Sequence, residues 1–300
     1  MQFSYFYGGI DSHFRLIDNL VAWSVEFITL NHRQCDFILQ SKLRQLEIIN
    51  RDFKKAGIAM RALHAPFGFE DNLSDENEER RLKTLHIHKE IIRRLPSLGI
   101  GILHIHPSLG SAFEDRNAPR EIIFTQLLKS LKELVSVAGD FDVRLGLENT
   151  PASLGSPEEL LSIMEVFNSR SLGVCYDTGH AHISSGVIHG MNILGKHIFD
   201  FHIHDNNAVQ DNHLQPPYGT IDWKSFIEKV AEIGFTGPLT IESLSWGNAG
   251  LERMAREVEA FFSGRIVHWE DGDKRGIVSC SDCRHIFILT PTGPSCCCKK

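Results

Sequence analysis

Nine residues of metal-ligand type are spread over the middle of the chain, each at or just after the end of a short apolar run. They are His64, His106, Glu148, Asp177, His180, His202, Asp211, His213 and Glu242. Mixed imidazole and carboxylate donors suit Zn²⁺, Mn²⁺, Fe²⁺ or Co²⁺ better than Ca²⁺ or Mg²⁺. One catalytic ion takes roughly three or four protein ligands. The set could therefore hold between one and three ions, with a carboxylate bridging two of them.

The three carboxylates that end apolar runs carry most of this interpretation. Glu148, Asp177 and Glu242 each follow residues that should be buried, where an unpaired carboxylate is costly. A metal ion, or a neighbouring imidazole, would offset that cost. A single histidine in a chain with 16 of them is more often a surface residue or a satisfied core residue. The joint occurrence favours a metal site.

The apolar runs alternate with amphipathic stretches, which predicts eight strands and seven clear helices. The strands are expected at 2–7, 24–30, 58–64, 100–106, 142–148, 172–177, 198–204 and 238–242. The helices are expected at 11–22, 41–56, 77–95, 119–138, 157–168, 224–233 and 250–262, with a further, weaker one within 179–196. This alternation predicts a parallel sheet with right-handed crossovers. Eight repeats favour a closed (β/α)8 TIM barrel over residues 1–264, with an open doubly wound sheet as the alternative.

Helix ends support these boundaries. Ser156-Pro-Glu-Glu159 is typical of a helix start, and Asp222 precedes another. Gly57, Gly99 and Gly234 follow predicted helices closely, where a left-handed residue is common.

A barrel would bring the candidate ligands together, because catalytic groups sit at the C-terminal ends of its strands. Residues two apart in a strand face the same side. His104 and His106 therefore both face the interior, with His106 nearer the mouth and His104 one layer deeper. His202 and His204 share a face in the same way, and alternation alone does not choose between them.

Composition narrows the function classes. The net charge of −7 indicates no excess of Lys and Arg, which argues against non-specific nucleic-acid binding. No run approaches the ~20 apolar residues of a membrane span, and the N-terminus shows no signal-peptide pattern. We expect a cytoplasmic protein with no membrane partner; the sequence leaves a homodimer open.

Residues 265–300 break the pattern and form a cysteine-rich appendage. A hairpin with a turn at Asp271-Gly272 is expected at its start. Cys280 and Cys283 have the spacing of half a zinc site, which Cys296 and Cys298, or Cys297, could complete as a small structural zinc-binding hairpin. The alternative is an unstructured, oxidation-prone tail.

The ordered motifs resemble those of the xylose isomerase-like TIM-barrel superfamily. They are His64-Ala-Pro, His106-Pro, Glu148-Asn-Thr, Asp177-Thr-Gly-His180, His202-Ile-His204-Asp205-Asn and Ile-Glu242-Ser, over roughly residues 1–262. The segment Asp211 to Trp223 also resembles the family, except that Pro216-Pro-Tyr-Gly219 replaces the usual Pro-Gly-x-Gly. The group holds sugar and sugar-phosphate isomerases and epimerases, and also endonuclease IV.

The isomerase branch implies one divalent ion, Mn²⁺ or Zn²⁺, held by Glu148, Asp177, His202 and Glu242. His180 would contact the substrate, His204 would be a supporting or substrate-facing residue, and Asp205 would orient an imidazole. The endonuclease branch implies three zinc ions. It adds His64, His106, His180, Asp211 and His213 as ligands.

The leading hypothesis is isomerisation or epimerisation of a small sugar or sugar phosphate. Glu148 and Glu242 would exchange a proton next to the carbonyl, with His180 assisting, through an ene-diolate. The alternative is a multinuclear zinc phosphoesterase, which the full ligand set favours. The acidic stretch 65–80 and the absence of Lys and Arg from 205–220 argue against DNA as its substrate. A metal-dependent binding protein without activity is the third class.

Overall fold

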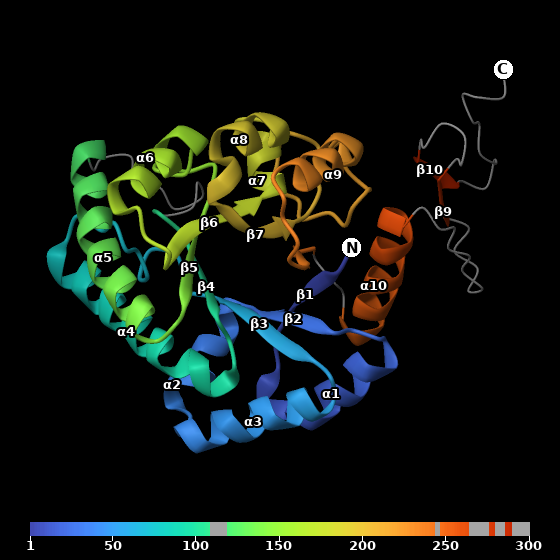
Figure 1. Cartoon of the computed structure of the whole chain (residues 1–300), viewed down its shortest axis with the longest axis horizontal. Helices are drawn as coiled ribbons and strands as arrows, with labels where there is room; N and C mark the ends of the chain where they lie inside the picture. The colour runs from blue at the N-terminus through green and yellow to red at the C-terminus, as the bar shows by residue number, and fades with distance from the viewer. Residues whose placement is uncertain (109–118, 244–246, 264–275, 280–285, 290–300) are drawn as a thin grey trace.

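The computed structural model describes residues 1–108, 119–243, 247–263, 276–279 and 286–289. Eight parallel strands close into a barrel in the order β1 to β8, and helices surround it, which confirms the predicted TIM barrel (Figure 1). The strands are β1 Phe3–Tyr7, β2 Phe27–Leu30, β3 Ala59–His64, β4 Ile102–Ile105, β5 Arg144–Glu148, β6 Leu172–Asp177, β7 Ile198–Ile203 and β8 Leu239–Ile241. All eight lie where the sequence predicts them.

The helices follow the strands in turn. The longer ones are α1 His13–Ala22, α3 Leu43–Lys55, α4 Glu78–Leu98, α5 Arg120–Asp140, α6 Pro157–Phe167, α9 Trp223–Glu232 and α10 Gly247–Ser263. Shorter pieces are η1 Ile10–Ser12, η2 His32–Gln34, α2 Cys35–Gln40, α7 Thr178–Ile183, α8 Val187–Leu194 and η3 Gly195–His197. The expected helix within 179–196 is thus two helices, α7 and α8. The sequence interpretation missed α2.

Local capping explains several boundaries. The Ser156 side chain accepts from the Glu159 amide, and the Glu159 side chain accepts from the Ser156 amide, so α6 begins with a complete capping box. Asp222 caps α9 by accepting from the Ser225 amide. Gly99 ends α4 with a φ of 72°, in the left-handed region where a side chain would be strained.

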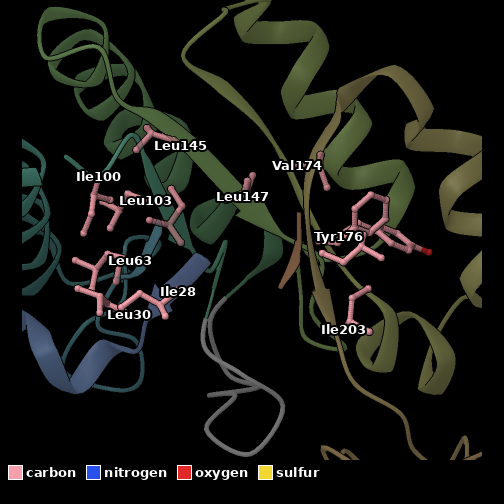
Figure 2. Packing of buried hydrophobic residues seen from close by; sticks show 14 of the residues in the cluster. Ile28, Leu30, Leu63, Ile100, Leu103, Leu145, Leu147, Val174, Tyr176 and Ile203 are labelled. Carbon is pink, nitrogen blue, oxygen red and sulfur yellow. The ribbon is translucent and has the colours of Figure 1, made fainter. Parts of the chain in front are cut away.

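The apolar core fills the space between the barrel and its helices (Figure 2). Leu63, Leu103, Leu147 and Ile203 come from four different strands, and each is fully buried. This layer holds the strands rigidly, so the positions of the side chains at their C-terminal ends are fixed.

The pairing of β6 with β7 contains a register shift. Val174 pairs with Ile198, but the next residue, Cys175, pairs with Asp200, so that Phe199 is an extra residue in β7. Beyond the shift, Asp177 pairs with His202. The shift therefore brings two candidate ligands side by side.

Two short antiparallel strands, β9 Gly276–Ser279 and β10 Ile286–Leu289, form a hairpin after the barrel. The predicted Asp271-Gly272 turn and the cysteines at 280, 283 and 296–298 lie outside the described residues. None of the helices within the described ranges has the length and apolar character needed to cross a bilayer.

Candidate metal centre

Glu148, the last residue of β5, lies at the centre of the barrel mouth. Its side chain is 1% exposed. Its Oε2 lies 3.4 Å from His64 Nε2 and 3.7 Å from His106 Nε2, and 3.1 Å from His202 Nδ1. Its Oε1 lies 3.3 Å from His180 Nδ1. One carboxylate thus joins imidazoles from four different strand ends.

The nine predicted ligands fall into three groups, and within each group the donor atoms lie within 4.8 Å of one another. Group one is His64, His106 and Glu148; group two is Glu148, Asp177, His202 and Glu242; group three is His180, Asp211 and His213, joined by His204. Glu148 belongs to groups one and two. The structure therefore brings together every residue of both ligand sets that the sequence suggests.

Donor spacing fits divalent ions. Zinc bonds of roughly 2.0–2.1 Å place the donors of a tetrahedral site roughly 3.3 Å apart. In group three, Asp211 Oδ2 lies 3.3 Å from His180 Nε2 and 3.2 Å from His213 Nε2. Glu148 Oε2 lies at similar distances from its partners in groups one and two.

Several buried donor atoms at the site also lack a hydrogen bond. They include Glu148 Oε2, Asp177 Oδ2, His202 Nδ1 and Glu242 Oε2. A buried polar atom without a partner costs about 1–3 kcal/mol. A bound cation would satisfy these atoms, so the residues present fit the divalent metal that the donor types suggest.

Three imidazoles are held with Nε2 facing the site. Nδ1 of His64 donates to the Ala65 carbonyl at 2.7 Å, and Nδ1 of His180 to the Asn149 carbonyl at 2.9 Å. Nδ1 of His213 donates to the Glu242 carbonyl at 2.8 Å. These bonds place the proton on Nδ1 and leave the Nε2 lone pair free for a metal, a common arrangement around bound ions.

The local charges favour ionised carboxylates. Burial alone would raise the pKa of Glu148, but the nearby charge of His202 holds it well below its ordinary value. Burial opposes a charge on His213, yet the hydrogen bond with Asp211 and the charge of Glu242 raise its pKa to about 10. His106 is different, because burial lowers its pKa to about 3.

A family model described as "Xylose isomerase-like TIM barrel" matches residues 19–261. The chain belongs to this family. The match begins within α1 and ends within α10, so it takes in β2 to β8 but not β1 (Figure 1).

Two relatives and one solved structure are similar to the chain. An uncharacterised protein of Methanocaldococcus jannaschii is 31% identical over 60% of this chain and 63% of its own length. A probable endonuclease 4 of Aquifex aeolicus is 33% identical over 44% of each chain. The chain thus spans less than two thirds of either relative. The crystal structure of a D-psicose 3-epimerase shares the fold with a TM-score of 0.76 and 15% identity, over 87% of this chain and 98% of the other.

His204 and Asp205 make contacts beyond those that the family resemblance implies. His204 Nε2 lies 3.0 Å from Asp177 Oδ1 and 3.6 Å from Asp211 Oδ1, so this residue is within ligand distance of group three. The role of Asp205 in orienting an imidazole stays an expectation, and its hydrogen bonds within the described residues go to other groups. Its carboxylate accepts from the Trp223 indole at 2.8 Å and from backbone amides, including that of Ile221 at 3.1 Å.

Sequence reasoning missed the residues beneath the ligands. Asp200, Arg61 and Cys175 were not singled out, although Asp200 precedes His202 by two positions and so could share its face. Phe67 also reaches the site: its ring centroid lies 4.5 Å from that of His106 and 5.1 Å from that of His64. It gives this family member an apolar wall beside group one.

Proposed function

We propose that the chain is a metal-dependent hydrolase of small phosphoesters that holds three divalent ions in the barrel mouth. One observation carries this proposal: all nine candidate ligands converge in three groups, two of which share Glu148. Chemistry with a single ion needs only group two. Groups one and three, apart from a substrate contact of His180, would then be clusters of polar residues without a metal-binding role.

The protein's own residues would position the ions and exclude bulk water. When bound, divalent ions supply a water of lowered pKa as nucleophile and neutralise charge on the leaving oxygen. Glu148 fixes the spacing between groups one and two, because its Oε2 faces His64 and His202. Asp211 fixes group three by facing both His180 and His213.

The loops around the mouth favour a small substrate over DNA. The described loops after β3, β5 and β7 (residues 65–77, 149–156 and 204–222) contain no Lys or Arg. A protein that follows a nucleic-acid backbone neutralises several phosphates with such residues. The likeness to a probable endonuclease 4 thus supports phosphoester chemistry, whereas the loops favour a substrate with one phosphate that the ions themselves meet.

A second candidate is isomerisation or epimerisation of a small sugar or sugar phosphate. Group two favours it, since Glu148, Asp177, His202 and Glu242 suffice for one ion, and the likeness to a D-psicose 3-epimerase supports it. Glu148 and Glu242 would exchange the proton next to the carbonyl on opposite sides of the substrate, through an ene-diolate.

The test separates the two candidates by ion count and activity. Full-length chain with the tail cysteines replaced by serine would be purified without chelators, alongside a His64→Gln/His106→Gln variant. Elemental analysis should find three ions per chain, and the variant should lose one ion and at least 100-fold of its rate on 4-nitrophenyl phosphate or bis(4-nitrophenyl) phosphate.

The sugar reaction has its own probe, exchange of ketose protons for deuterium in D₂O. One ion per chain, with proton exchange unaffected in the variant, would overturn the hydrolase proposal and support the second candidate. Three ions with neither activity on any probe would contradict both.

A further inference from the structure

We propose that His104 and Asp200 are positioning residues that fix the imidazole of His202 with Nδ1 facing group two, and that Arg61 anchors them. We name these four residues the interior relay. The inference rests on the proposed function only through metal binding by group two, which both candidate functions require.

The upper end of the relay is His202, which is fully buried. Its Nδ1 lies 2.8 Å from Glu242 Oε2 and 3.1 Å from Glu148 Oε2. Its Nε2 lies 2.9 Å from His104 Nδ1. His202 therefore meets the metal group with one ring nitrogen and His104 with the other.

The lower end runs through the barrel interior away from the mouth. His104 Nε2 lies 2.9 Å from Asp200 Oδ2. Arg61 Nη1 donates to both oxygens of Asp200 at 2.7 Å, and the Phe201 amide donates to Oδ1 at 2.8 Å. Asp200 and His104 are fully buried, and the Arg61 side chain is 14% exposed. Arg61 thus offsets the cost of burying the carboxylate.

Only one arrangement of protons satisfies every contact when His202 binds a metal. A neutral imidazole that offers Nδ1 to an ion carries its proton on Nε2. That proton is donated to His104 Nδ1, so His104 carries its own proton on Nε2 and donates it to Asp200. The reverse order would place a proton on His202 Nδ1, which faces the ion site.

Two further observations favour a relay over alternative roles. His104, Cys175 and His202 are close enough to form an ion site of their own, but both ring nitrogens of His104 already have partners, which leaves no lone pair. Gly146 of β5 leaves room for the ring, since a Cβ there would lie 2.9 Å from His104 Cδ2. Apolar residues of similar volume would be the less costly filling for this layer.

Asp200→Asn tests the relay with almost no change in shape. The Phe201 amide donates to Oδ1 and Arg61 donates to both oxygens, so the asparagine oxygen should take the place of Oδ1 and its NH₂ should face His104, with the loss of one Arg61 contact. His104 would then carry its proton on Nδ1 and oppose the Nε2 proton of His202. A comparable exchange in the serine protease triad leaves the geometry intact and sets the wrong tautomer.

Two readouts are needed, Zn²⁺ affinity by chelator competition and ¹⁵N NMR of the histidine rings. We expect Zn²⁺ affinity to fall about 10–100-fold, as for other residues that support metal ligands. The His202 ring signals, assigned with His202→Gln, should change from the Nε2-protonated to the Nδ1-protonated form.

Thr29→Val is the matched control. Thr29 is also fully buried, and its hydroxyl lies 3.0 Å from that of Ser4 and 3.2 Å from that of Thr240. It does not touch the relay. This variant should lose stability but keep wild-type Zn²⁺ affinity and ring signals.

The outcomes separate the relay from the proposed function. Wild-type affinity and an unchanged His202 tautomer in Asp200→Asn would overturn the relay. If the wild-type chain binds Zn²⁺ at group two but hydrolyses no phosphoester, the proposed function fails, while the affinity and the tautomer of the Zn²⁺-loaded protein still test the relay. Should Asp200→Asn not fold, His104→Asn and His104→Leu replace it. Asparagine at position 104 offers His202 a hydrogen-bond acceptor, whereas leucine offers none. Only the leucine variant should therefore lower the Zn²⁺ affinity.

Discussion

Asp205 illustrates at the scale of one residue how a buried carboxylate can serve structure beside a metal centre. Oδ2 accepts from the Trp223 indole, and Oδ1 accepts from the amides of Asn206 and Ile221. All of these groups are donors. The carboxylate therefore ties the segment after β7 to the start of α9.

Replacing Asp205 with asparagine should weaken this tie without emptying the metal centre. The new NH₂ must face a donor, so we expect a loss of about 1–3 kcal/mol in the free energy of unfolding, measured in urea. The ion content by elemental analysis should stay at the wild-type value. Asp222→Asn in the same segment is the control and should change little, because asparagine is also a good N-cap.

The opposite pattern, unchanged stability with fewer bound ions, would support the imidazole-orienting role that the family resemblance implies for Asp205.

Glu148, Asp177 and Glu242 were predictable as candidate ligands because each one ends an apolar run whose burial makes an unpaired polar side chain costly. Asp200 was not predictable by that logic. Asp200 lies inside the run Ile198–Ile203 rather than at its end. The alternation of inward and outward side chains, counted from Ile198, also does not reveal that the strand contains an extra residue. Alternation also does not predict the contacts of His204. Its ring stacks on that of His213 with centroids 4.0 Å apart, and this contact depends on the fold of the loop that follows β7.

At the scale of elements, the strands and long helices were predictable from periodicity and caps. The short helices were not. Residues Cys35–Gln40 form α2 directly after a turn of 3₁₀ helix, and no side chain caps its start. The break between α7 and α8 is made by Gly186, whose φ of 89° ends the helical path. Such pieces are set by packing on the barrel rather than by local preference.

The long helix α4 contains a buried histidine that should make stability depend on pH. His88 is 1% exposed, and its Nδ1 donates to the Thr84 carbonyl at 2.9 Å. Burial lowers its pKa from 6.5 to about 4. Between these values the unfolded chain binds a proton that the folded chain does not, so stability is fully present above pH 6.5 and falls as the pH drops towards 4.

His88→Gln should remove this dependence. The stability advantage of the wild type over the variant should shrink by roughly 2–3 kcal/mol between about pH 7 and pH 4.5, as measured by urea unfolding. Other buried histidines titrate alike in both proteins and cancel in the difference. A difference that stays constant across this range would show that His88 is not buried in its neutral form.

At the scale of the whole molecule, the barrel should be independent of the cysteine-rich segment. The last barrel helix, α10, ends at Ser263, and its Phe262 ring lies 5.3 Å from that of Phe3 and 5.6 Å from that of Trp223. A chain of residues 1–264 keeps these contacts. We expect it to melt within a few degrees of full-length protein and to keep the ions of the mouth.

Elemental analysis of both lengths measures the appendage at the same time. One additional zinc ion in the full-length chain would support the predicted site at Cys280, Cys283, Cys296 and Cys298. Loss of ions from the mouth on truncation would instead show that the barrel needs the segment beyond residue 264.

The extra residue Phe199 in β7 sets how this barrel tolerates change. Cys175 and Asp177 face the interior, and beyond the shift Asp200 and His202 pair with them on that side. Removing Phe199 itself would turn the shift into regular pairing and leave Asp200 and His202 on the interior side, because Cys175 already pairs with Asp200 and Asp177 with His202. Removing Phe201 would instead exchange the two faces of the strand beyond it, so that His202 would point towards the helices. We therefore expect β7 to tolerate the loss of its extra residue but not the loss of a residue between Asp200 and His202.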